Sequence, residues 1–290
     1  TSTQDGSSSR TNCRKPQPAR SNGTNCAKGM TPEGEQWGHL AIAGRDIECQ
    51  WREPRRDGQP TLVFLHEGLG LVSAWGDFPA RLAHETGCGI LVYSRYGYGK
   101  STVLAEPFGV EFMHREAIET LPAVLADLQV SDPVLVGHSD GASIALIYAG
   151  EGDNPVRALV LEAPHVFVET ISVEAIARIK ADYESSSDLR DRLARHHTDP
   201  DRTFYGWNDA WLNPEFLNWN IEGYLPGIEC PTLVVQGEDD EYGTAAQIDA
   251  IERRSGGPVE RLMLANCGHS PHRDQAEATL RAMAAFLEGL

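Results

Sequence analysis

Three segments of the chain carry residue types suited to nucleophilic catalysis. A G-x-S-x-G pentapeptide places Ser139 between two glycines, the acidic run 238–241 follows Gly237, and His269 lies near the C-terminus. A serine hydroxyl is a weak nucleophile at neutral pH and needs a base that a third group orients. The chain order serine, carboxylate, histidine therefore predicts a catalytic triad, in which any carboxylate of 238–241 could be the acid.

The residues around Ser139 predict a sharp turn between a strand and a helix. The apolar run 133–136 precedes it and the helix-like run 142–149 follows it. This is the context of a nucleophile elbow, where the serine stands clear of the sheet. The backbone N–H of Asp140, at the start of the helix, is expected to donate to the oxyanion formed during the reaction.

The carboxylate and the histidine also follow predicted strands. The apolar run 232–235 comes before Gly237, and the run 261–264 comes before the loop that holds His269. Strand-like and helix-like runs alternate along the chain, after a hairpin over 39–51, and helices are predicted at 74–85 and 111–128. The alternation predicts an α/β fold with a mostly parallel, doubly wound sheet of about eight strands covered by helices on both faces.

One segment interrupts this alternation. About seventy residues separate the strands predicted at 157–161 and 232–235, more than an ordinary connection needs. We expect residues 169–222 to form a helical lid over the carboxyl ends of the strands, with the core domain made of 30–168 and 223–290. Charged amphipathic patterns predict helices at 171–183 and 188–196. The aromatic residues of 203–219 are expected mainly in the lid core, with one or two facing an apolar pocket.

Composition limits the partners of the chain. The net charge is −17, and residues 1–29 hold five basic residues and one acidic residue, which leaves 20 basic and 41 acidic residues in the remainder. Such a surface repels phosphate backbones, which argues against nucleic acid.

No run approaches the roughly 18 apolar residues of a membrane span. Six scattered cysteines without C-x-x-C favour a cytoplasmic protein. We expect the substrate to be a small molecule. We expect the protein to be a monomer or a homodimer.

Residues 1–29 look unlike the rest of the chain. They are rich in Ser, Thr, Asn, Arg and Gly and almost free of large apolar residues. We expect a disordered tail, an expression remnant or translated upstream sequence, with the folded domain beginning near Met30.

Other histidines of the chain could be catalytic groups or metal ligands. His269 and His272 form an H-x-x-H pair, but no third ligand is apparent, so no metal is expected. The side chain of His138 is expected to point away from the serine hydroxyl. His196 and His197, within the insertion, are expected to be a solvated pair.

Four motifs in this order resemble the α/β-hydrolase superfamily over about residues 38–290. They are the elbow, the loop His66-Glu67-Gly68-Leu69-Gly70, the Gly-Glu-Asp-Asp turn and the Gly-His loop. The resemblance implies Ser139 as nucleophile, His269 as base and Asp240 as acid, with Asp239 as the alternative. It implies Gly68 as the second oxyanion donor, with Leu69 as the alternative. Many members have His-Gly where this chain has His66-Glu67, and Glu67 is expected to be structural or to touch substrate.

The resemblance implies hydrolysis of a carboxylic ester, or less readily an amide or carbamate, with a small to medium apolar substrate and an acyl-enzyme intermediate. No cofactor is expected. Carbon–carbon bond hydrolysis and perhydrolysis on the same triad remain alternatives, as does a slow-turnover ligand receptor. The residues expected to contact substrate are Glu67, Leu69, His138, Trp207 and Trp211.

Overall fold

An eight-stranded sheet forms the centre of the molecule in the computed structural model, which describes residues 36–55, 58–152 and 154–290 besides Thr1. The expected tail and the domain start near Met30 lie outside these residues. The strands are β1 Gln36–Ile42, β2 Arg45–Arg52, β3 Thr61–Leu65, β4 Gly89–Tyr93, β5 Val134–His138, β6 Ala158–Glu162, β7 Thr232–Gly237 and β8 Val259–Leu264.

The strand order is β1-β2-β4-β3-β5-β6-β7-β8. The β1–β2 and β2–β4 pairs are antiparallel, and every pair from β4 to β8 is parallel. The predicted fold class, with its opening hairpin, is confirmed. Because the carboxyl ends of the parallel strands meet at one edge of the sheet, the loops after them can share a site.

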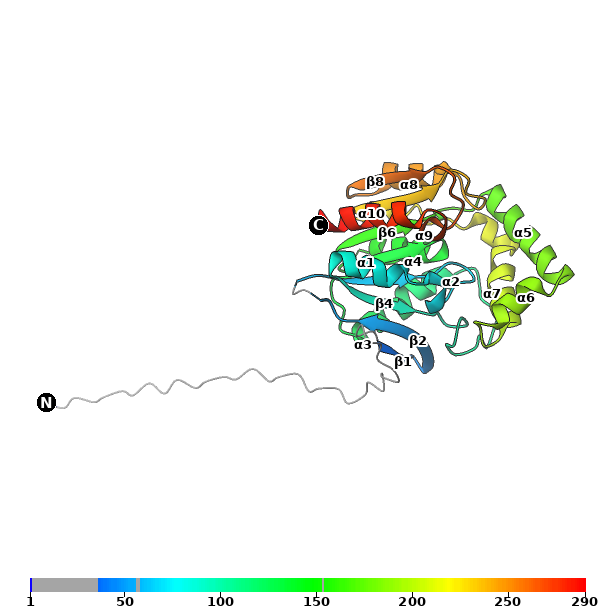
Figure 1. Cartoon of the computed structure of the whole chain (residues 1–290), viewed down its shortest axis with the longest axis horizontal. Coiled ribbons are helices and arrows are strands. Elements are labelled where there is room, and N and C mark those ends of the chain that lie inside the picture. The colour runs from blue at the N-terminus through cyan, green and yellow to red at the C-terminus, as the bar shows by residue number, and fades with distance from the viewer. Residues whose placement is uncertain (2–35, 56–57, 153) are drawn as a thin grey trace.

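Helices cover both faces of the sheet (Figure 1). Their bounds are α1 Phe78–Thr86, α2 Phe112–Arg115, α3 Leu121–Asp127, α4 Asp140–Gly150, α5 Thr170–Ser185, α6 Asp188–Ala194, α7 Pro200–Trp211, α8 Ala245–Arg254, α9 Pro271–Asp274 and α10 Ala276–Glu288.

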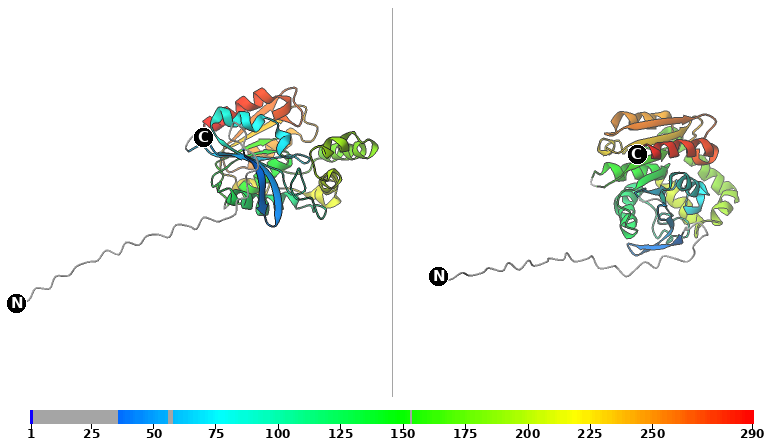
Figure 2. Two further views of the ribbon diagram at one scale, coloured as in Figure 1. Left: turned by 60° about the horizontal axis from the view of Figure 1, so that its bottom comes forward. Right: turned by 60° about the vertical axis from the view of Figure 1, so that its left-hand side comes forward.

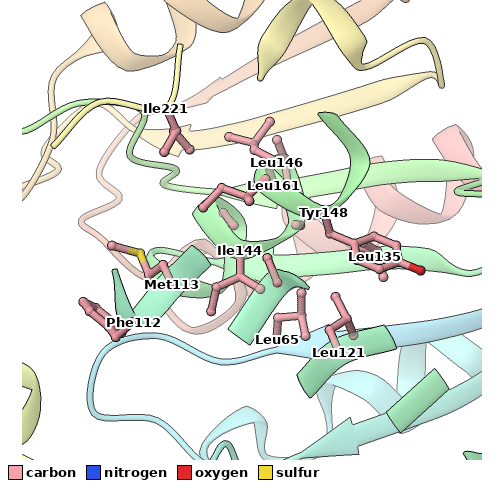
Figure 3. Close-up of a cluster of buried hydrophobic side chains, with 14 of the residues drawn as sticks. Leu65, Phe112, Met113, Leu121, Leu135, Ile144, Leu146, Tyr148, Leu161 and Ile221 are labelled. Atoms are coloured by element: carbon pink, nitrogen blue, oxygen red, sulfur yellow. The ribbon is translucent and has the colours of Figure 1, made fainter. Parts of the chain in front are cut away.

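Alternate residues of β3 enter two separate hydrophobic cores. Leu65 packs with residues of α2, α3 and α4, such as Leu121 and Ile144 (Figure 3). Phe64 packs on the other face with residues of α1 and α10, such as Leu82. A strand buried on both faces needs a continuous apolar run, which is the pattern that predicted these strands.

Two predicted helices differ in detail. The helix expected at 74–85 is divided at Gly76, whose φ is 59°, into the 3-10 turn Val72–Trp75 and α1. The helix expected at 111–128 runs from α2 to α3 through the π-helical turn Glu116–Thr120. Pro122 follows that turn and lacks an N–H, so the wider turn avoids a clash between its ring and the preceding carbonyls.

The segment between β6 and β7 is helical. It contains α5, α6 and α7 and the 3-10 turns Pro214–Asn218 and Leu225–Gly227. We call residues 169–222 the helical insertion. Figures 1 and 2 show its three α-helices together, to one side of the sheet. Most of its aromatic side chains are buried; these are Phe204, Trp207, Trp211, Phe216 and Trp219.

The expectation of a solvated histidine pair in the insertion is wrong for His197. His196 is exposed, but His197 is 2 % exposed. The N–H of Gly99 donates to its Nδ1 at 3.0 Å, so the other ring nitrogen carries the proton and lies 3.2 Å from the Leu69 carbonyl oxygen. Burial lowers the pKa of His197 to about 4. The neutral imidazole therefore ties the insertion to two loops of the core.

Across residues 36–55, 58–152 and 154–290, no helix is both long enough and apolar enough to cross a lipid bilayer.

Candidate active site

The turn between β5 and α4 holds Ser139 in a strained conformation. Its φ and ψ are 53° and −118°, a region that non-glycine residues rarely adopt. A Cβ atom on Gly137 would lie 2.5 Å from the Gly141 carbonyl oxygen, and one on Gly141 would overlap with the Leu65 carbonyl oxygen. The two glycines therefore allow β5, α4 and the end of β3 to approach closely enough to form the elbow.

His269, in the loop after β8, contacts both the serine and an aspartate. Its Nε2 lies 2.9 Å from Ser139 Oγ, and its Nδ1 lies 2.8 Å from Asp240 Oδ1. An ionised carboxylate only accepts hydrogen bonds, so Nδ1 carries the proton and Nε2 can accept the serine proton. The arrangement can therefore remove a proton from Ser139 as its oxygen attacks an electrophile.

Asp240 follows β7 and is held by several donors. Its Oδ1 accepts the N–H of Tyr242 at 2.9 Å, and its Oδ2 accepts the side-chain amide of Gln236 at 3.0 Å. Burial alone would raise the pKa of Asp240, but the hydrogen bond and charge of His269 outweigh it and lower the pKa to about 2. Asp239 is exposed. Of the two aspartates left open by the sequence, Asp240 is the one that contacts His269.

The loop after β3 places a turn beside Ser139. The N–H of Gly70 donates to the Glu67 carbonyl at 3.1 Å, which closes the turn around Gly68 and Leu69. Asp140 opens α4, where an N–H has no acceptor within its own helix. Within the described ranges, no backbone acceptor is found for the N–H of Gly68. Both groups are thus available to a ligand, as an oxyanion site requires.

A cavity of about 240 Å³ lies at this edge of the sheet and is lined by Ser139 and His269. All five residues expected to contact substrate line it: Glu67, Leu69, His138, Trp207 and Trp211. Ligand cavities typically measure roughly 300–1,000 Å³, so this one suits a small substrate. Ile176 and Ile179 of α5 add to an apolar part of the lining, while Glu241, Tyr242 and Arg273 make another part polar.

Trp207 and Trp211 lie one turn apart on α7 and therefore on the same face of the helix. The Trp211 indole N–H donates to Asp140 Oδ1 at 3.1 Å. Burial raises the pKa of Asp140 to about 6, although Arg95 and this hydrogen bond act in the opposite direction. The Trp207 indole packs against Gly68. The helical insertion thus contacts both residues whose N–H groups could bind an oxyanion.

Glu67 and His138 lie beside the histidine of the site. His138 Nε2 is 2.7 Å from the His269 carbonyl oxygen, so this nitrogen donates and Nδ1 faces Glu67, 3.7 Å from Oε2. Arg273 lies 3.5 Å from the other carboxylate oxygen of Glu67. Burial by itself would raise the pKa of Glu67. The interactions with His138 and Arg273 are stronger than this effect and lower the pKa of Glu67 well below its usual value. Glu67 therefore faces the site as an anion.

Two buried residues of the site were missed in the sequence. His165 lines the cavity, with its ring centroid 5.7 Å from that of His269, and burial lowers its pKa to about 3. It lies just after β6, so its position beyond the end of a strand could have identified it as a residue of the site. Arg95 Nη2 donates to the Glu67 carbonyl at 2.8 Å and supports the turn after β3. No pattern in the sequence indicates that Arg95 is buried and makes this contact.

The H-x-x-H pair does not converge on one point. His269 contacts Asp240, whereas His272 Nδ1 lies 2.6 Å from Glu162 Oε2. In the part of the chain that the structure describes, no group of three or more His, Cys, Asp or Glu side chains is placed to hold a metal ion.

Comparison with known proteins identifies relatives over most of the chain. A bifunctional esterase/perhydrolase of Acinetobacter calcoaceticus is 27% identical over 209 residues, which are 62% of this chain and 74% of that protein. The serine hydrolase BPHL of Mus musculus is 26% identical over 80% of each chain. The crystal structure of a membrane phospholipase A aligns with a TM-score of 0.71 at 20% identity, over 89% of this chain and 87% of that one, which shows a shared fold.

A sequence model of the alpha/beta hydrolase family matches residues 62–282, a range that runs from β3 into α10 and contains every residue of the site. The strand order, the parallel pairing and this match agree. The chain belongs to the α/β-hydrolase family.

Proposed function

We propose that this protein is a serine hydrolase that cleaves a carboxylic ester of a small to medium substrate through an acyl-enzyme. The observation that carries the proposal is the position of one imidazole, His269, within hydrogen-bonding distance of both Ser139 and Asp240. Membership of a hydrolase family and relatives named as esterase and serine hydrolase support it.

In the first half of the reaction, Ser139 Oγ attacks the ester carbonyl carbon while His269 Nε2 takes the serine proton. Asp240 keeps the imidazole in the required tautomer and stabilises the imidazolium. The N–H groups of Gly68 and Asp140 bind the oxyanion, and each donor of this kind contributes roughly 3 kcal/mol to the transition state. The imidazolium then protonates the leaving alkoxide, and the acyl group stays on Ser139.

In the second half, His269 removes a proton from water, and the resulting hydroxide attacks the acyl carbon. Collapse of the second oxyanion breaks the bond to Ser139, whose oxygen takes the proton back from His269. The helical insertion acts as a lid in this proposal, because α5 and α7 supply the apolar lining beside the serine. A dry lining strengthens the interactions of the triad and the oxyanion donors.

The proposal is tested with p-nitrophenyl esters of acetate, propionate and butyrate. Steady-state release of p-nitrophenol is expected from the wild type, and Ser139→Ala is expected to lower kcat by at least about 10³-fold. Ser131→Ala is the matched control, because Ser131 is exposed and precedes the opposite end of β5. Turnover that survives in Ser139→Ala would contradict the proposal.

Other outcomes of this experiment favour the alternatives. A single burst without turnover would favour a slow-turnover receptor. Inertness toward esters, together with Ser139-dependent cleavage of a diketone, would favour carbon–carbon bond hydrolysis.

Perhydrolysis is a second candidate activity, because one relative is named an esterase/perhydrolase. Hydrogen peroxide would replace water in the attack on the acyl-enzyme, which gives a peracid and regenerates Ser139. Adding hydrogen peroxide to the ester assay and measuring peracid by iodide oxidation tests this activity. Peracid formation at the same rate in Ser139→Ala would exclude it.

A further inference from the structure

His197 makes a buried contact between the helical insertion and the turn after β3. Its Nδ1 accepts the N–H of Gly99 at 3.0 Å, so Nε2 carries the proton and donates to the Leu69 carbonyl oxygen at 3.2 Å. The side chain is 2 % exposed, so both hydrogen bonds are shielded from water. Burial also lowers the pKa of His197 to about 4, which keeps one donor and one acceptor on the ring near neutral pH.

Leu69 belongs to the turn that presents the N–H of Gly68 to the site. The N–H of Gly70 donates to the Glu67 carbonyl at 3.1 Å and closes this turn. The Leu69 carbonyl and the Gly70 N–H are the two polar ends of one planar peptide group. The hydrogen bond from His197 therefore fixes the plane of that group, and with it the direction of the N–H that closes the turn.

The core and the helical insertion hold this turn from different sides. On the core side, Arg95 Nη2 donates to the first carbonyl of the turn at 2.8 Å. On the side of the insertion, His197 donates to the carbonyl of Leu69, and the Trp207 indole packs against Gly68. The geometry of the turn thus depends on contacts from the insertion as well as on contacts from the core.

The imidazole of His197 is itself held in place by the residues that follow it. The N–H of Thr198 donates to the Gly99 carbonyl at 3.0 Å, and the hydroxyl of Thr203 donates to the Gly97 carbonyl at 2.7 Å. These bonds join the start of α7 and the residues before it to the loop after β4. A side chain can position another group only if its own place is fixed, and His197 meets this condition.

We propose that His197 is a positioning residue for the oxyanion site, because its hydrogen bond to the Leu69 carbonyl keeps the N–H of Gly68 directed at the oxygen that becomes charged. This inference rests on the proposed ester hydrolysis and adds a residue of the helical insertion to its machinery. An oxyanion donor is effective when it is already oriented toward the position where charge develops. Loss of this orientation is expected to lower kcat more than it changes KM, because the interaction strengthens in the transition state.

Two amide replacements separate the two hydrogen bonds of the ring. His197→Asn places an amide oxygen near the position of Nδ1, so it keeps the acceptor for Gly99 and loses the donor to Leu69. His197→Gln places an amide nitrogen near the position of Nε2 and restores that donor. On p-nitrophenyl acetate, we expect His197→Asn to lower kcat about tenfold with KM changed by less than about twofold, and His197→Gln to recover most of the loss. His196→Asn is the matched control, because His196 is adjacent and exposed, and should keep the wild-type kcat.

Three kinetic results would overturn the proposal. An unchanged kcat in His197→Asn would show that the turn does not need this hydrogen bond. Equal losses in His197→Asn and His197→Gln would assign the effect to the attachment of the insertion and not to the bond with Leu69. A raised KM with an unchanged kcat would assign His197 to substrate binding.

Hydrogen exchange tests the same contact without turnover. The exchange rate of the Gly70 amide, measured by NMR, should rise about tenfold in His197→Asn and stay unchanged in His196→Asn, while the amides of β3 exchange as in the wild type. This result stands even if the protein hydrolyses no ester, so the two proposals can fail separately. Unchanged exchange at Gly70 in His197→Asn would overturn the positioning role even in an active esterase. Faster exchange throughout β3 would show a general loss of stability and would also overturn it.

Discussion

Two histidine–carboxylate pairs lie close together at the carboxyl edge of the sheet, and they differ in what surrounds them. His269 and Asp240 are 2.8 Å apart, and His272 and Glu162 are 2.6 Å apart; both histidines use Nδ1. The first pair lies beside Ser139 and lines the cavity. The second is almost completely buried, with the indole of Trp75 against the His272 ring at 4.6 Å between centroids.

The comparison shows that two features decide whether a histidine–carboxylate pair can take part in a reaction. One is the group that the second ring nitrogen of the histidine contacts, and the other is whether a ligand can reach the pair. In the first pair, Nε2 meets a hydroxyl group at the wall of a cavity. In the second, the carboxylate links α9, which follows the loop that carries His269, to the end of β6, and the rings of Trp75 and Phe78 pack against His272, which does not line the cavity. The first pair is thus suited to proton transfer, and the second to holding the loop that carries His269.

The largest expected effect separates the two aspartates of the turn after β7. Asp240→Asn should lower kcat by about 10⁴-fold, because the amide no longer fixes the imidazole tautomer. Asp239→Asn is the control, since Asp239 is exposed, and should leave kcat unchanged. Steady-state assays of both variants on one ester measure the difference. Equal losses in the two variants would refute the assignment of the acid.

The buried pair should affect stability instead of catalysis. Glu162→Gln is expected to lower the free energy of unfolding by about 3 kcal/mol, because it leaves His272 without its charged partner in a buried site. Burial alone would raise the pKa of Glu162, but His272 outweighs it and lowers the pKa below its usual value. Urea unfolding and kcat are measured on the same samples. A loss of kcat as large as that of Asp240→Asn, with unchanged stability, would contradict the comparison.

His138 lies between the two pairs and should have an intermediate effect. Its ring is 5.2 Å from that of His269 and 5.1 Å from that of His272, and its Nε2 donates to the His269 carbonyl. His138→Phe removes one hydrogen bond that holds the loop and should lower kcat roughly tenfold. His138→Gln, which restores a donor, should recover part of the loss. If kcat does not change in either variant, the loop is held by the buried pair alone.

The smallest effect is a change of stability with pH. The folded pKa of Asp240, about 2, is below its unfolded value, so its ionisation stabilises the fold above the unfolded pKa and this contribution is lost as the pH falls through the folded pKa. The stability difference between wild type and Asp240→Asn should therefore shrink by about 1 kcal/mol between pH 7 and pH 3. Urea unfolding at the two pH values measures it. A difference that grows on acidification would show that the pKa is raised.

Much of the fold could be predicted from the sequence because local patterns decide it. The apolar runs at β3, β5 and β7 identify strands buried on both faces, and the glycines around Ser139 identify the elbow. The break at Gly76 and the π-helical turn before Pro122 were missed, because a helical pattern continues through both. The burial of His197 was missed because its acceptors and donors lie in loops about a hundred residues away.

The sequence by itself determined the order of the elements and the three segments whose side chains could do chemistry, because strand, turn and helix signals act over a few neighbouring residues. The tertiary structure decided which of these groups meet. His269 and Ser139 are 130 residues apart in the chain, and only the packing of β5 and β8 in one sheet brings their atoms to 2.9 Å. The same packing paired His272 with Glu162 and placed Trp207 of the helical insertion against Gly68, because contacts between distant segments depend on how whole elements pack.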